Sequence, residues 1–130
     1  MMPLTVERWE SIAQTRNFAL IDELLADDVV FESPIVHTPQ LGPAITKKYL
    51  IAAVQILGGP EMRFIGRWFA DSSAVLELET VVHLVKINAV DIMSWNRENR
   101  INHFKVMVRP LKAINVLHEK MGMLLASARG

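Results

Sequence analysis

Residues 86–110 constrain the fold more than any other part of the chain, because they form two runs of strand-like sequence joined by a short polar turn. Side chains alternate between the two faces of a β-strand. One face of the first run therefore carries Ile87, Ala89, Asp91, Met93 and Trp95. The basic residues of the second run share one face, so we expect its other face, with Phe104, to turn toward the core. Asp91 is then a single carboxylate among apolar side chains.

Asp91 is the first candidate for a functional residue. A buried carboxylate without a cationic partner is costly when ionised, so we expect its pKa to be raised. Groups with strongly perturbed pKa values cluster at functional sites. The alternative is a structural Asp91 whose carboxyl group is satisfied by the Trp9 N–H, the Tyr49 O–H or the backbone. The sequence leaves both interpretations open.

Helices are expected before the strands. Thr5 is a candidate cap for a first helix and Asn17 for a short second helix ending at residue 25. A short β segment at 29–33 should follow the break at Asp27-Asp28. After a loop over 34–42, Pro43 is well placed to begin a third helix that Gly58-Gly59-Pro60 ends. Its apolar face is predicted to be Ile45, Tyr49, Ala52, Ala53 and Ile56.

From residue 62 the apolar pattern changes to a period of two. Strict alternation places Arg63 and Arg67 on the same type of face as Glu77 and Glu79, which predicts cross-strand ion pairs on the outer face. A last helix is expected to open at Pro110. The outer face of the sheet would still carry apolar residues, which predicts a homodimer through this face: Val75, Val81, Val90, Ile92, Ile101 and Met107.

This order of elements predicts an α+β fold over residues 1–130 as a single domain. A cone-shaped, curved antiparallel or mixed sheet would wrap around the N-terminal helices, with a C-terminal helix beside it. A strongly bent sheet closed by helices leaves a conical apolar pocket between the layers. Three Trp, five Phe and seven Met in 130 residues suit such a cavity or a large soft core.

Composition excludes several classes of function. The chain has no cysteine, which excludes disulfides and thiolate catalysis, and its 14 basic and 14 acidic residues give no one-sided field for nucleic acid. We expect no membrane span, no signal peptide and a cytoplasmic location. The histidines at positions 37, 83, 103 and 118 lack metal-ligand spacing. We therefore expect no metal and no cofactor.

Four segments together resemble the SnoaL-like, nuclear-transport-factor-2-like superfamily: residues 24–34 (LLADDVVFESP), Gly42-Pro43, Val90-Asp91 and residues 101–110 (INHFKVMVRP). The resemblance covers nearly the whole chain. It implies a cone-shaped α+β barrel with a deep pocket, usually dimeric. Members of this superfamily include ketosteroid isomerases, polyketide cyclases, epoxide hydrolases, dehydratases and non-catalytic binding modules.

The resemblance to ketosteroid isomerase implies that Asp91 takes the place of the aspartic acid that stabilises an oxyanion. Ser33 stands where that family has its general base, with Glu32 just before it, and Trp9 falls near the position of its tyrosine. One of three catalytic groups is thus matched. The cyclase members pair an acid with a histidine, which here would be Asp91 and His37. The epoxide hydrolases need an Asp–Arg–Asp set, for which Arg109 points to the wrong face.

The sequence therefore gives two hypotheses. In the first, the protein is a cofactor-independent acid–base enzyme (an isomerase, cyclase or hydrolase) that acts on an apolar cyclic metabolite, with Asp91 and His37 as catalytic residues. In the second, it is a non-catalytic ligand-binding or dimerisation module that uses the same pocket. The expected pocket lining is Trp9, Phe31, Ser33, Tyr49, Phe64, Trp68, Met93 and Phe104.

Overall fold

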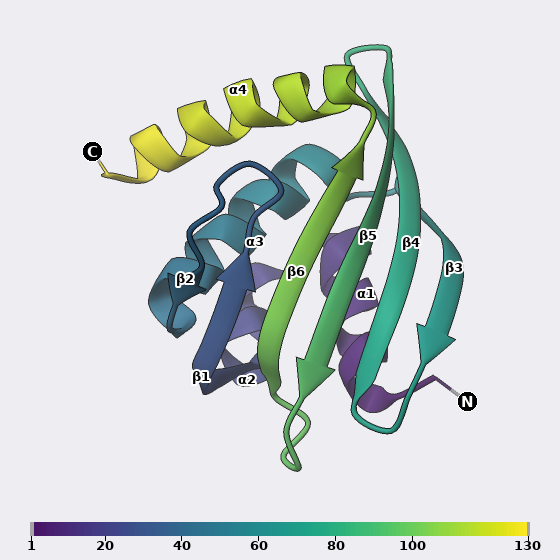
Figure 1. Cartoon of the computed structure of the whole chain (residues 1–130), viewed down its shortest axis with the longest axis vertical. Helices are drawn as coiled ribbons and strands as arrows, with labels where there is room; N and C mark the ends of the chain where they lie inside the picture. The colour runs from purple at the N-terminus through teal and green to yellow at the C-terminus, as the bar shows by residue number, and fades with distance from the viewer. Residues whose placement is uncertain (1, 130) are drawn as a thin grey trace.

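A curved six-stranded sheet carries the fold, as the computed structural model of residues 2–129 shows (Figure 1). The strand order is β2-β1-β6-β5-β4-β3, with β1 and β6 parallel and the other neighbours antiparallel. The strands are β1 (Leu25–Glu32), β2 (Gln40–Leu41), β3 (Arg63–Phe69), β4 (Ser73–Val82), β5 (Val85–Trp95) and β6 (Ile101–Arg109). The sheet bends without closing on itself, which confirms the predicted α+β architecture.

The helices lie against one face and one end of this sheet. They are α1 (Leu4–Thr15), the 3₁₀ turn η1 (Phe18–Leu20), α2 (Ile21–Leu24), α3 (Pro43–Leu57) and α4 (Leu111–Arg129). Figure 1 shows α1 and α3 behind the strands, with α4 crossing the end of the sheet where β6 finishes. None of the helices within residues 2–129 is long and apolar enough to cross a membrane.

Two of the predicted helix caps are wrong, whereas the limits of α3 are confirmed. Helix α1 begins one residue before Thr5, whose hydroxyl donates across to the carbonyl oxygen of Asn99 at 3.1 Å. Asn17 precedes η1 without a capping hydrogen bond from its side chain. Helix α3 begins at Pro43 and ends before Gly58, as the Pro and Gly positions predict.

The buried face of α3 differs from the predicted stripe. The residues it buries fully are Thr46, Leu50, Ala52, Val54 and Leu57. Two apolar clusters explain the difference: Leu50 and Val54 join the main core under the sheet, whereas Ala52 and Leu57 join a second core with α4. A helix between two cores is covered on more than one side, so a single stripe does not describe it.

Strand β1 is longer than predicted. It begins at Leu25 and runs through Asp27 and Asp28, which are both exposed. The pairing with β6 is irregular between Leu25 and Val30, and this irregularity lets two adjacent carboxylates remain in the strand while facing water. The predicted break at Asp27-Asp28 is therefore wrong, because the strand continues through both residues.

A β-bulge in β3 overturns the predicted alternation of that strand. Phe64 lies opposite Leu78, but the next pair is Gly66 with Glu77, so Ile65 is the extra residue. Beyond it the faces exchange. Arg67 now lies opposite the buried Leu76 on the inner face.

The same exchange places Trp68 on the outer face, where 57% of it is exposed. Its ring lies over Gly66, since a Cβ atom at residue 66 would come within 2.7 Å of the ring. Of the predicted outer ion pairs, Arg63–Glu79 is present and Arg67 with Glu77 or Glu79 is not. A similar register shift after Ser94 turns Ile101 inward opposite Trp95, so its assignment to the outer face is also wrong.

Candidate functional site

Asp91 lies in the middle of the sheet, on the inner face of β5. Its neighbours across the strands are Leu76 on β4 and Val106 on β6, both buried. Only 4% of Asp91 is exposed. Trp9 of α1, itself 4% exposed, donates its Nε1–H to Asp91 Oδ2 at 3.0 Å. Helix α1 thus supplies the hydrogen-bond donor for the one carboxylate of this strand.

The surroundings of Asp91 favour its neutral form. Burial in apolar surroundings raises the pKa of Asp91 to about 7. The hydrogen bond from Trp9 opposes this rise, because it stabilises the carboxylate, whereas the negative charge of Glu10 adds to it. Near neutral pH both forms of Asp91 are therefore populated, which is the condition that suits a group for acid or base chemistry.

Glu10 and Arg67 form a second polar group on the inner face that sequence reasoning missed. Arg67 donates from Nε and from Nη2 to the two carboxylate oxygens of Glu10, each at 2.7 Å. The hydrogen bond with Glu10 raises the pKa of Arg67. Only 7% of Glu10 is exposed, and the guanidinium group lies 5.9 Å from the centre of the Phe64 ring.

The signal for this ion pair is Gly66. A glycine inside a strand pattern often marks a bulge. The bulge brings Arg67 to the face where Glu10 lies, next to Trp9 in the sequence. Strict alternation therefore predicted a solvent-facing Arg67, although Arg67 is the one cation on the inner face of β3.

Four aromatic rings connect α3 with Asp91. Tyr49 lies 5.3 Å from Phe31, Phe31 lies 6.1 Å from Phe104, and Phe104 lies 4.9 Å from Trp9 in an edge-to-face arrangement. Met93 and Phe64 are buried in the same core. The structure thus brings together these predicted lining residues: Trp9, Phe31, Tyr49, Phe64, Met93 and Phe104. Trp68 does not join them.

Ser33 and Glu32 are engaged elsewhere. The Ser33 hydroxyl oxygen accepts the backbone N–H of Ile35 at 2.9 Å and of Val36 at 3.3 Å, so it shapes the turn after β1. Glu32 contacts His103 Nε2 at 2.6 Å and Lys105 Nζ at 3.5 Å. The hydrogen bond with His103 lowers the pKa of Glu32.

His37 is exposed in the loop between β1 and β2. Among the described side chains, Trp9 is the hydrogen-bond partner of Asp91, and His37 is not. Three surface hollows lie elsewhere, and none of them is lined by Asp91. Within residues 2–129 no three His, Asp or Glu side chains are grouped so that they could hold a metal ion.

Comparison with solved structures finds close matches to this fold. A steroid delta-isomerase from Pseudomonas aeruginosa superposes with a TM-score of 0.88 at 28% identity, over 95% of this chain and 90% of that one. A protein with a cystatin-like fold from Silicibacter pomeroyi gives 0.86 at 25% identity, over 94% and 85%.

A more distant match shows the same fold. A protein with a ketosteroid isomerase-like fold from Catenulispora acidiphila gives a TM-score of 0.62 at 10% identity, over 82% of this chain and 85% of that one. Searches of protein-family models and of curated proteins find no match to the sequence.

Proposed function

Since the chain belongs to the nuclear-transport-factor-2-like superfamily, which has the ketosteroid isomerase-like fold, we propose that it acts on a flat, largely apolar cyclic molecule by cofactor-free acid–base chemistry. Asp91 is the proton donor or acceptor of this reaction. One observation carries the proposal: Asp91 is buried in the apolar interior with a pKa of about 7. The similar steroid delta-isomerase suggests a carbonyl compound such as a cyclic ketone as the first substrate class to test.

The neutral form of Asp91 supplies the chemistry. Its O–H donates a hydrogen bond to a substrate carbonyl oxygen, and this bond becomes stronger as negative charge develops on that oxygen. Water that enters with the substrate takes the proton from the neighbouring carbon and returns it at the γ-carbon. The indole N–H of Trp9, 3.0 Å from Asp91, is a second donor at the same place. A substrate oxygen must displace or share this N–H, because it now engages Asp91 Oδ2.

The ring series selects the substrate. Tyr49, Phe31 and Phe104 pack in series between α3 and Trp9. Phe31 and Phe104 are fully buried, so a substrate ring must enter between these packed rings to reach Asp91. A flat apolar ring system can take their contacts, whereas a charged molecule would lose its hydration without gaining a partner. The Glu10–Arg67 pair is already complete, so it does not replace that partner.

A second candidate is a non-catalytic module that binds a similar molecule. Two observations favour it. Residue 33 is a serine whose hydroxyl is used in a turn, so it is not a proton acceptor. The carboxyl group of Asp91 is covered by Trp9. In this case Asp91 only anchors the ligand by a hydrogen bond.

The experiment compares the wild type with Asp91→Asn and with the matched control Glu32→Gln. Each protein is mixed with a Δ5-3-ketosteroid and with smaller β,γ-unsaturated cyclic ketones, and formation of the conjugated enone is followed by ultraviolet absorbance. We expect turnover by the wild type and by Glu32→Gln, and a loss of about 100-fold or more in Asp91→Asn. Full turnover in Asp91→Asn would remove Asp91 from the chemistry. Binding without turnover by the wild type would favour the second candidate.

We also propose that two copies associate through the outer face of the sheet. Met107 is 52% exposed on this face, beside the half-buried Val90, and Val81 is 47% exposed farther along β4. Apolar side chains spread over an outer sheet face are typical of an interface between copies.

A further inference from the structure

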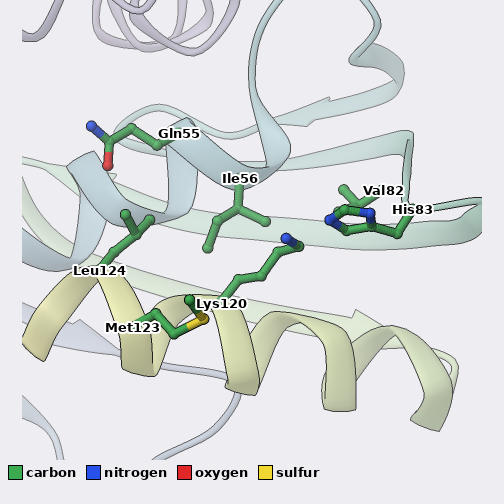
Figure 2. Close-up of a pocket in the computed structure, with 7 residues that line it drawn as sticks. All are labelled: Gln55, Ile56, Val82, His83, Lys120, Met123 and Leu124. Carbon is green, nitrogen blue, oxygen red and sulfur yellow. The ribbon is translucent and has the colours of Figure 1, made fainter.

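A hollow of about 400 Å³ lies between the end of α3, the second half of α4 and the β4–β5 hairpin (Figure 2). It borders the second apolar cluster, between α3 and α4, and not the main core that contains Asp91. Its apolar wall comes from three elements and consists of Ile56, Val82, Met123 and Leu124. Its polar groups are Gln55, His83 and Lys120. This volume is in the range of small-molecule sites.

Lys120 is the cation of this hollow. Figure 2 shows its side chain extending from α4 below Ile56 toward His83. It is half-buried, and no salt bridge found among the described residues includes it. A partly desolvated ammonium group above an apolar wall suits a ligand that carries one negative charge on an apolar body.

The hairpin that supplies His83 is strained. Val82 pairs with Val85, so His83 and Leu84 form a two-residue turn, and both have positive φ angles of 48° and 66°. Such turns favour Asn-Gly, because a side chain with a Cβ is disfavoured there and a bulky one more so. Leu84 is also 96% exposed. The sequence thus keeps an imidazole and an exposed apolar side chain where a more stable turn is available, which points to function.

We propose that this hollow binds an amphipathic carboxylate, such as a medium-chain fatty acid, at a site separate from Asp91. The carboxylate lies between Lys120 and His83. The chain lies along Ile56, Met123 and Leu124. The site goes beyond the proposed acid–base function and does not depend on it.

The probe is decanoate, titrated into the full chain and followed by isothermal titration calorimetry and by backbone amide chemical shifts. We expect saturable binding with shifts confined to residues 82–85, the end of α3 and the second half of α4. Lys120→Met keeps the aliphatic stem but removes the charge, so it should weaken binding by about fivefold. Lys112→Met, on the same helix but outside the hollow, should change nothing. Decanol lacks the negative charge, so its affinity for the wild type should be about as weak as the affinity of decanoate for Lys120→Met.

The double variant H83N/L84G tests the role of the strained turn. It supplies the residues that the turn geometry favours, so we expect a higher melting temperature together with weaker decanoate binding. Equal affinity in this variant would show that the strain serves no ligand there. Three other results would overturn the proposal: shifts centred on Asp91 and Trp9, equal weakening by Lys112→Met, or binding that saturates only as the protein self-associates in light scattering.

Discussion

At the scale of single residues, the account depends on how Asp91 is held. Its carboxyl group is removed from water and receives one N–H from Trp9. One such bond does not compensate for burial of a charge, so the pKa of Asp91 is raised to about 7. The sequence predicted both the burial and the direction of the shift, because only one carboxylate occurs on the apolar face of that strand. It left open which donor would meet it.

The raised pKa of Asp91 predicts a pH-dependent stability. The folded state holds its proton up to about pH 7, whereas the unfolded chain releases it near pH 4. The unfolded state therefore binds fewer protons between these values, and stability falls as pH rises through this window. Because the pKa of Asp91 rises from 3.8 in the unfolded chain to about 7 in the fold, this fall in stability amounts to about 4 kcal/mol.

Asp91→Asn removes this dependence while its amide oxygen can still accept from Trp9. Urea unfolding at several pH values between 4 and 8 should therefore show the variant gaining on the wild type as pH rises. Glu32→Gln is the control, because the pKa of Glu32 is lowered rather than raised. Parallel curves for the wild type and Asp91→Asn would contradict the assigned pKa.

At the scale of elements, small irregularities decide which side chains reach the interior. The extra residue Ile65 in β3 turns Arg67 inward to Glu10 and Trp68 outward. The shift after Ser94 turns Ile101 inward. Periodicity predicted β3 to β6 and part of β1, but it missed the short β2 and could not predict the faces beyond a bulge. The glycine at residue 66 was the one local signal, and a glycine alone does not fix where the extra residue lies.

Two arginines on β3 test the effect of the bulge. Arg67→Met leaves the buried carboxylate of Glu10 without its partner, so we expect a loss of about 2 kcal/mol in the free energy of unfolding. This is less than for a fully buried pair, because the Arg67 side chain is 35% exposed. Arg63→Met removes the same residue type from the same strand, but from an exposed pair with Glu79, and should cost about 0–1 kcal/mol. Equal losses in urea unfolding would place Arg67 outside.

At the scale of the whole molecule, the order of elements was predictable and the form of the interior was not. Proline and glycine fix the limits of α3, and the change of period at residue 62 marks the start of the four consecutive strands β3 to β6. The four-ring series from Tyr49 to Trp9, by contrast, depends on how α1 and α3 dock on the sheet. Long-range docking of this kind is not encoded in local spacing.

The proposed homodimer is tested at the same scale. Met107→Arg places a charge on the outer face of β6, and Leu111→Arg, at a residue that is 71% exposed on α4, is the control. We expect light scattering at micromolar concentration to give a dimer for the wild type and for Leu111→Arg, but a monomer for Met107→Arg. A monomeric wild type would refute the proposed interface.

The central claim is that Asp91, buried in the apolar core, is protonated in a large fraction of the molecules at neutral pH. Its most direct test is a titration of the Asp91 carboxyl carbon by NMR in the folded wild type, with the signal assigned by its loss in Asp91→Asn. The account predicts a midpoint near pH 7. A midpoint near the ordinary value of about 4 would mean that Asp91 is a carboxylate throughout the neutral range, and the proposed acid chemistry would lose its basis.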